Sequence, residues 1–220
     1  MKFTTSLLAA AIALAAAPAF ATDTGFYVGA GMGYSKISIN ENKLDNNIDA
    51  ALPAPWFVDK SNVDQNATPY MFTFGYRLMP YLAAEVAYID MGSASYKANA
   101  TTPKGGNGIV KGTWSADGWP VSVLGIWPID DTWEVFGRVG AMFGSVDLKA
   151  RAVDGATSTQ LAKLNASNNS NQFFGGVGVD ANFMDSWAAR FEWQAMPSLG
   201  NDDTGSANFN NFMVSILYKF

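Results

Sequence analysis

The feature that most constrains the fold is an alternation of apolar with small or polar residues along most of the chain after residue 24. Successive side chains of a β-strand point to opposite faces, so a period of two predicts strands rather than helices. In residues 187–194, for example, Phe191 and Trp193 share one face, and Arg190 and Glu192 share the other. The segments that follow this pattern are 26–35, 70–78, 82–88, 119–127, 133–143, 172–183, 187–194 and 212–220.

The connections between these eight segments alternate between short and long. Three are tight links rich in turn residues, at 79–80, 128–131 and 184–186. Four are long and polar, at 37–67, 95–113, 146–171 and 197–208. This rhythm predicts an all-β fold: an eight-stranded antiparallel up-and-down transmembrane β-barrel with short periplasmic turns and four long external loops.

The composition indicates which face of the strands lies outside. Charged residues make up only 15% of the chain, too few to cover the surface of a soluble, lipocalin-like barrel. One face of the strands is bulky and apolar, with aromatic residues such as Trp119 and Trp127 toward the strand ends, as in the aromatic girdles of membrane barrels. The other face carries small residues and a few balanced charges, which suits a narrow lumen. We therefore expect the apolar face to meet lipid.

The N-terminal residues 1–21 have the pattern of a cleaved secretory signal peptide, which leaves 22–220 as the barrel domain. Lys2 supplies the positive start, residues 7–17 are apolar, and Ala19 and Ala21 form a small-x-small cleavage site. The apolar run is shorter than the roughly 20 residues that a membrane-spanning helix needs. The sequence thus predicts export from the cytoplasm.

The absence of Cys and His removes several kinds of chemistry. It excludes Ser-His-Asp and Cys-His catalysis and metal sites built on these ligands. We expect no enzymatic activity, no cofactor and no metal site. The net charge is −5, and Lys and Arg are scattered singly along the sequence, so we expect no basic stripe and no nucleic-acid partner.

Four segments together resemble the OmpA-like eight-stranded outer-membrane family: 25–30, 85–92, 189–194 and 214–220. The resemblance implies the bacterial outer membrane as location, contact with lipid and lipopolysaccharide, and the transmembrane domain alone, without a periplasmic domain. The chain end, with Tyr218 and Phe220, looks like the terminal signal that the barrel-assembly machinery reads.

The resemblance also implies a switchable salt-bridge plug inside the barrel, at Glu85, Asp180 and Arg190. Leu124 stands where the family can place a Lys, so Arg190 is expected to have no cationic competitor for Glu85. The alternation adds inward-facing charges that we expect in the same network, at Arg77, Glu134, Arg138 and Glu192.

Two functions stay open at this point. The first is a structural and surface role in the envelope, with at most a narrow, salt-bridge-plugged pore for small solutes and loops that can meet an extracellular ligand. The second is a channel for small hydrophobic ligands, as in OmpW-like barrels, with a lumen lined by Met71, Phe136, Met142 and Phe174. An apolar patch in the first loop, residues 52–57, fits either the loop's own packing or contact with a partner.

Overall fold

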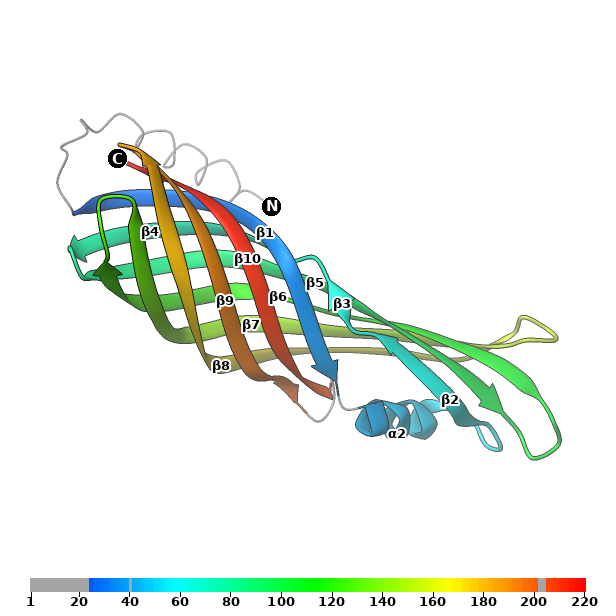
Figure 1. Cartoon of the computed structure of the whole chain (residues 1–220). Coiled ribbons are helices and arrows are strands. Elements are labelled where there is room, and N and C mark those ends of the chain that lie inside the picture. Colours follow the sequence, from blue (N-terminus) through cyan, green and yellow to red (C-terminus); the bar gives the residue numbers. More distant parts are fainter. Residues whose placement is uncertain (1–23, 40, 202–204) are drawn as a thin grey trace, which may run out of the picture.

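The architecture is a ring of eight antiparallel strands, seen in a computed structural model that describes residues 24–39, 41–201 and 205–220 (Figure 1). The ring contains β1 (Gly25–Ile39), β4 (Tyr70–Met79), β5 (Leu82–Thr101), β6 (Asn107–Pro128), β7 (Trp133–Asp154), β8 (Gln160–Met184), β9 (Trp187–Asn201) and β10 (Gly205–Lys219). A helix, α2 (Glu41–Ala51), and two short strands, β2 (Phe57–Asp64) and β3 (Asn66–Ala67), lie between β1 and β4 in the sequence. The predicted signal peptide, residues 1–21, lies outside the described residues.

The ring closes because the first strand pairs with the last. β1 and β10 are in register from Tyr27 opposite Lys219 to Ile39 opposite Ala207. Every other strand of the ring pairs with its neighbours in sequence, apart from the insertion of β2 and β3. Closure leaves no open edge within the bilayer, as a membrane-spanning sheet requires. The predicted eight-stranded up-and-down barrel is confirmed.

The large apolar side chains point outward, as the alternation predicts. Phe173 is 83% exposed, Trp127 72% and Val139 69%, which in water would be a costly surface. Aromatic residues pair near the strand ends on this face, for example Trp187 with Tyr218 at 4.9 Å between ring centroids. The outer face is therefore built for lipid. Within the described part of the chain, no helix is long and apolar enough to cross a bilayer.

The predicted long loops are wrong in their extent, because most of their residues are strand. Residues 95–113 belong largely to a hairpin of β5 and β6 that turns at 102–106, and residues 146–171 to a hairpin of β7 and β8 that turns at 155–159. The fourth predicted loop, 197–208, is also mostly strand, in β9 and β10. Figure 1 shows β5–β8 continuing well past the end of the neighbouring strands. We call this four-stranded part, residues 93–117 and 145–169, the extension.

In the extension the apolar face of the strands is the inner one and the polar face is the outer one, the reverse of the membrane-spanning part. This inversion explains why the sequence pattern predicts loops there. There the buried, inward side chains are apolar, such as Tyr96, Trp114 and Leu148, whereas Lys97 and Lys111 point outward and are exposed. This is the pattern of a sheet in water, with its apolar side packed and its polar side solvated. On β6 the outward face changes from Trp119 to Asp117 and Ser115, so the lipid-facing surface ends there.

A bulge in β5 keeps its side chains on the correct face at this boundary. The pairing with β6 shifts between Asp90 and Ser93, so the inward series passes from Met91 to Ala94. Gly92 has φ +76°, a backbone conformation that glycine adopts without strain, and a Cβ there would lie 2.9 Å from Cβ of Ala67. The glycine thus permits the change of register where the barrel enters water.

The first connection folds against the inner side of the extension instead of forming a polar loop. Ile48 of α2 and Leu52 after it are buried in the apolar cluster that also contains Trp114 and Leu148. In the patch at 52–57, Leu52 is buried and the Trp56 ring packs against Gly106 and Gly108, whereas Phe57 stays 42% exposed. Leu52 and Trp56 therefore serve the protein's own packing, whereas residues 53–55 and Phe57 stay exposed.

Two aspartates fasten the helix. The hydroxyls of Tyr96 and Ser61 donate hydrogen bonds to the Asp45 carboxylate at 2.5 and 2.8 Å. The Val58 amide donates to Asp49 at 2.6 Å. Burial and the neighbouring Asp45 carboxylate raise the pKa of the Tyr96 phenol, so it keeps its proton and remains a donor at any physiological pH.

Substitution of Asp45 should loosen this first connection. We expect Asp45→Ala to raise the rate of tryptic cleavage at Lys43 and Lys60 severalfold in lipid vesicles, because α2 loses two anchoring hydrogen bonds and local unfolding becomes easier. The rates are measured by mass spectrometry of the released fragments. Asp59→Ala is the control, since Asp59 is exposed. Equal cleavage of both variants would show that Asp45 does not hold the helix.

Candidate functional site

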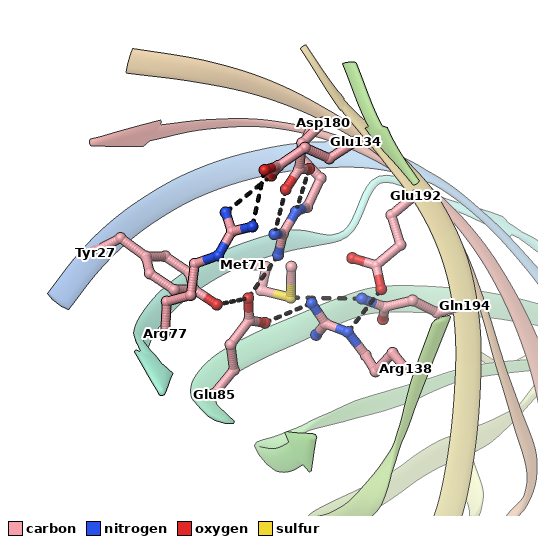
Figure 2. A network of polar contacts seen from close by, with 10 residues as sticks. Tyr27, Met71, Arg77, Glu85, Glu134, Arg138, Asp180, Glu192 and Gln194 are labelled. Atoms are coloured by element: carbon pink, nitrogen blue, oxygen red, sulfur yellow. Dashed lines mark hydrogen bonds and ion pairs between the residues drawn. The ribbon is translucent and has the colours of Figure 1, made fainter. Parts of the chain in front are cut away.

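The strands bring the inward-facing charges together inside the membrane-spanning half of the barrel. Asp180 on β8 lies directly opposite Arg190 on β9, and Leu124 on β6 lies opposite Arg138 on β7. Figure 2 shows Glu85, Arg138 and Asp180 converging from different strands of the barrel. Charged side chains so deeply buried persist only when oppositely charged groups lie close by.

Glu85 on β5 is the centre of the cluster. One of its carboxylate oxygens accepts hydrogen bonds from Arg190 at 2.6 Å and from the Tyr27 hydroxyl at 2.5 Å. The other accepts a hydrogen bond from Arg138 at 2.5 Å. Three donors from three other strands thus fix one carboxylate across the lumen.

Arg190 joins Glu85 to Asp180. Its Nε and Nη2 atoms each lie 2.7 Å from an Asp180 oxygen, which is the paired geometry that makes guanidinium-carboxylate contacts strong. Its guanidinium carbon also lies 4.4 Å from the centre of the Phe136 ring, a cation-π contact. All the nitrogens of the Arg190 guanidinium therefore have a carboxylate partner.

The contact between Arg138 and Glu192 is less complete. Arg138 Nε lies 2.8 Å from Glu192 Oε1, within ion-pair distance but without the angle of a hydrogen bond. Among the described residues, neither Glu192 oxygen has a hydrogen-bond donor, and Nη1 of Arg138 has no acceptor. Glu192 is therefore the least constrained carboxylate of the cluster.

A second ion pair adjoins this cluster on the side of the tight turns, where Glu134 lies opposite Asp180. Arg77 on β4 donates to both oxygens of Glu134 on β7, at 2.9 and 3.1 Å, and also to the Pro80 carbonyl at 2.6 Å. The side chains are 12% and 10% exposed, whereas those of the central cluster are at most 4% exposed. This pair crosses the lumen at its periplasmic mouth.

One expectation about the plug is wrong. Arg190 does have a cationic competitor for Glu85, because Arg138 reaches the same carboxylate. The cation is absent at Leu124, but it is present on the neighbouring strand at the position directly opposite. Glu85 therefore contacts two cations at once, one on each carboxylate oxygen.

Sequence reasoning missed Tyr27 as a member of the cluster. Tyr27 is the one bulky residue on the otherwise small face of residues 26–35, and its ring fills the space left by Gly75, whose Cβ would come within 2.2 Å of it. A large polar aromatic among glycines on the lumen face is a signal that could have revealed it.

Next to the charges, toward the extension, the lumen is filled by apolar side chains. Met71, Met142, Phe174 and Met213 are buried in one cluster there, and we call them the apolar layer. Beside this layer, Ser35, Asn211 and Gln194 lie opposite one another on β1, β10 and β9, all fully buried, and Gln194 donates a hydrogen bond to the sulfur of Met71 at 3.8 Å. Each has a side-chain polar atom without a hydrogen-bond partner among the described residues.

The end of the chain is held against the first strand. The Phe220 amide donates to the Phe26 carbonyl at 3.0 Å, and the rings of Tyr218 and Phe220 lie 5.0 Å apart. Tyr218 points to the lipid side beside Trp187. Searched over the described residues, the structure has no group of three or more acidic side chains arranged to hold a metal ion.

The coupling between Arg190 and Asp180 can be measured directly. We expect Arg190→Met to lower the free energy of unfolding by about 3 to 5 kcal/mol, because Glu85 and Asp180 then lose a buried partner. The double variant Asp180→Asn/Arg190→Met should cost less than the sum of the single changes, by roughly 1 to 3 kcal/mol. Urea unfolding in lipid vesicles gives these values.

Arg77→Met is the matched control, since it removes the same side chain from the more accessible pair at the mouth. It should cost less than Arg190→Met. Additive effects of the Asp180 and Arg190 substitutions would show that their contact does not stabilise the barrel.

Comparison with known proteins agrees with this geometry. A family model described as the OmpA-like transmembrane domain matches residues 21–220. Outer membrane protein A of Serratia marcescens is 26% identical over 148 residues, which are 66% of this chain and 37% of that protein. Outer membrane protein A of Salmonella typhi is 27% identical over 148 residues, 66% of this chain and 38% of the relative. The chain thus aligns with well under half the length of these relatives.

Similar solved structures are also outer-membrane proteins. The attachment invasion locus protein Ail of Yersinia pestis has 13% identity and a TM-score of 0.47, with 89% of this chain and 99% of that chain covered. OprG of Pseudomonas aeruginosa has 12% identity and a TM-score of 0.45, with 92% and 99% covered. Since the family model spans the whole described barrel, the protein belongs to the OmpA-like transmembrane domain family and is a β-barrel of the bacterial outer membrane.

Proposed function

We propose that the protein has a non-enzymatic, structural and surface role in the outer membrane, with a lumen that is closed or passes only small solutes. The observation that carries the proposal is the filling of the lumen at two successive levels. The cluster centred on Glu85 occupies the first level, and the apolar layer occupies the second. Eight strands enclose an interior that side chains can fill, so such a barrel serves as a wall and a platform rather than a wide pore.

The two levels oppose the passage of solutes for different reasons. At the Glu85 cluster, a moving ion would have to displace hydrogen-bonded charges that are buried on all sides. At the apolar layer, an ion would lose its hydration without gaining a partner. Rearrangement of the two arginines around Glu85 can open the first level only. A narrow path therefore also needs movement of the side chains in the apolar layer.

The polar row of Ser35, Asn211 and Gln194 supports a path for water beside the apolar layer. Unpaired polar atoms buried in a lumen cost free energy unless water satisfies them. The row lies on three adjacent strands, so bound water could pass from one side chain to the next. Such a path fits small solutes only.

The alternative, a channel for small hydrophobic ligands, has less support. Met71, Met142 and Phe174 pack into the apolar cluster, and Phe136 covers the Arg190 guanidinium. These four side chains thus touch one another or the charges instead of lining an open passage. The strands between which a ligand could leave sideways are hydrogen-bonded along β1 and β10.

The outer surface and the chain end have roles of their own in this proposal. The exposed apolar belt contacts membrane lipid and lipopolysaccharide, and the extension presents its polar face to the exterior. Tyr218 and Phe220 serve as the signal for the barrel-assembly machinery. This role is supported by their position at the end of β10, the strand that closes the ring by pairing with β1.

Single-channel recording in planar bilayers tests the closed lumen. We expect no resolved current from the wild-type protein, and none from Glu85→Ala or Arg190→Ala, because the apolar layer remains in place. Combining Arg190→Ala with Met142→Ala and Phe174→Ala should give a resolved current.

Met142→Ala/Phe174→Ala with Arg190 intact is the control for this experiment, and it should stay silent because the charge cluster still blocks the lumen. Steady current through the wild-type protein would contradict the closed lumen and favour the narrow pore for small solutes, and passage of an apolar solute without ion current would favour the hydrophobic-ligand channel.

A further inference from the structure

A row of cations crosses the outer face of the extension. The register places Lys97 of β5 opposite Lys111 of β6, Lys111 opposite Arg151 of β7, and Arg151 opposite Lys163 of β8. All four side chains are exposed, and Lys149 lies two residues from Arg151 on the same face. The expectation that scattered Lys and Arg form no basic stripe is therefore wrong, because antiparallel pairing aligns residues that are far apart in the sequence. We call Lys97, Lys111, Arg151 and Lys163 the cation row.

The cation row has no ion-pair partner among the residues that the structure describes. Like charges directly opposite on neighbouring strands destabilise a sheet. Across the described part of the chain, no carboxylate lies within ion-pair distance of these four residues or of Lys149. The acidic residues of this face, Asp117 and Asp147, lie on the membrane side of the row. A chain of net charge −5 thus concentrates unpaired positive charge in one line.

A polar cavity continues the row at the seam between β1 and β5. It has a volume of about 570 Å³ and is lined by Lys36, Lys97, Ser95 and the segment 62–66. Lys97 belongs to both the row and the cavity, so the two form one continuous surface. The lining offers the ammonium groups of Lys36 and Lys97, one carboxylate, that of Asp64, and amide and hydroxyl groups.

The spacing and surroundings of the row identify the kind of partner. Neighbouring strands lie about 4.8 Å apart, so the row presents a charge at roughly each sugar length along about 14 Å. The same face carries Asn99, Thr113, Asn165 and other small polar residues, which can bond hydroxyl groups. The outward positions of the extension include no aromatic residue on which a nucleic-acid base could stack.

We propose that the cation row and its adjoining cavity bind a linear acidic polysaccharide outside the cell, with carboxylate or sulfate groups along the row and an end sugar in the cavity. The site lies on the extension, away from the lumen. It requires only that the extension faces the exterior, opposite the tight turns.

Binding of labelled dextran sulfate to the full-length protein in lipid nanodiscs without lipopolysaccharide tests this site. We expect measurable binding of dextran sulfate and none of neutral dextran of the same length. Lys111→Gln/Arg151→Gln should weaken binding about tenfold. In a plot of log Kd against the logarithm of the salt concentration, the slope should fall by about two. The charge-retaining variant Lys111→Arg/Arg151→Lys should bind as the wild type does, and so should Lys104→Gln, which removes an exposed charge at the hairpin turn.

Several results would overturn the proposal. The first is an equal loss of dextran sulfate binding in Lys104→Gln and in Lys111→Gln/Arg151→Gln. The others are binding of neutral dextran, and tighter binding of an oligo-dT strand of equal charge than of dextran sulfate. A heat-modifiable shift on gels confirms that each variant is folded. Current recordings are independent of this site, so failure here leaves the closed lumen standing, and an open lumen leaves the cation row standing.

Discussion

Within a bilayer no water is available to a backbone amide, so every strand of this protein needs a partner on both sides. The pairing of β1 with β10 meets that need and turns the sheet into a closed ring. With eight strands the ring is narrow, and its interior has room for side chains only. The charges on the inner face must then find partners across the lumen, as Glu85 does with Arg138 and Arg190.

The strands of the ring pass from lipid into water, and the polarity of their outward and inward side chains changes at that boundary. In the bilayer the outer face is apolar and the lumen holds charges, whereas in the extension the outer face is polar and the interior is an apolar cluster around Trp114 and Phe209, whose rings lie 5.5 Å apart. The two interiors meet at the apolar layer. The lumen that we propose to be closed and the cation row are thus consequences of one inversion along β5–β8.

The sequence predicts the part of the fold that lipid shapes. Strands such as 119–127 are evident because a bulky apolar residue recurs at every second position. The continuation of β6 to Asn107 is not evident from the sequence. Its outward residues, such as Lys111 and Thr113, are polar, so the segment resembles a loop when strands are recognised by their lipid-facing residues. Family resemblance points to Glu85, Asp180 and Arg190, but Arg138 as partner of Glu85 depends on which residues lie opposite each other. That register is set by turns and by the bulge at Gly92, and a single sequence does not reveal it.

The most direct test of the inversion is single-cysteine labelling along β6, which the absence of native Cys makes clean. Thr113→Cys and Ser115→Cys place a thiol on the outer face of the extension, Ala116→Cys places one inside, and Val123→Cys places one toward lipid. With a water-soluble maleimide on intact vesicles, we expect rapid labelling at 113 and 115, and protection at 116 and 123 until the protein is unfolded. Labelling at 123 as fast as at 113, or at 116 as fast as at 115, would contradict the account.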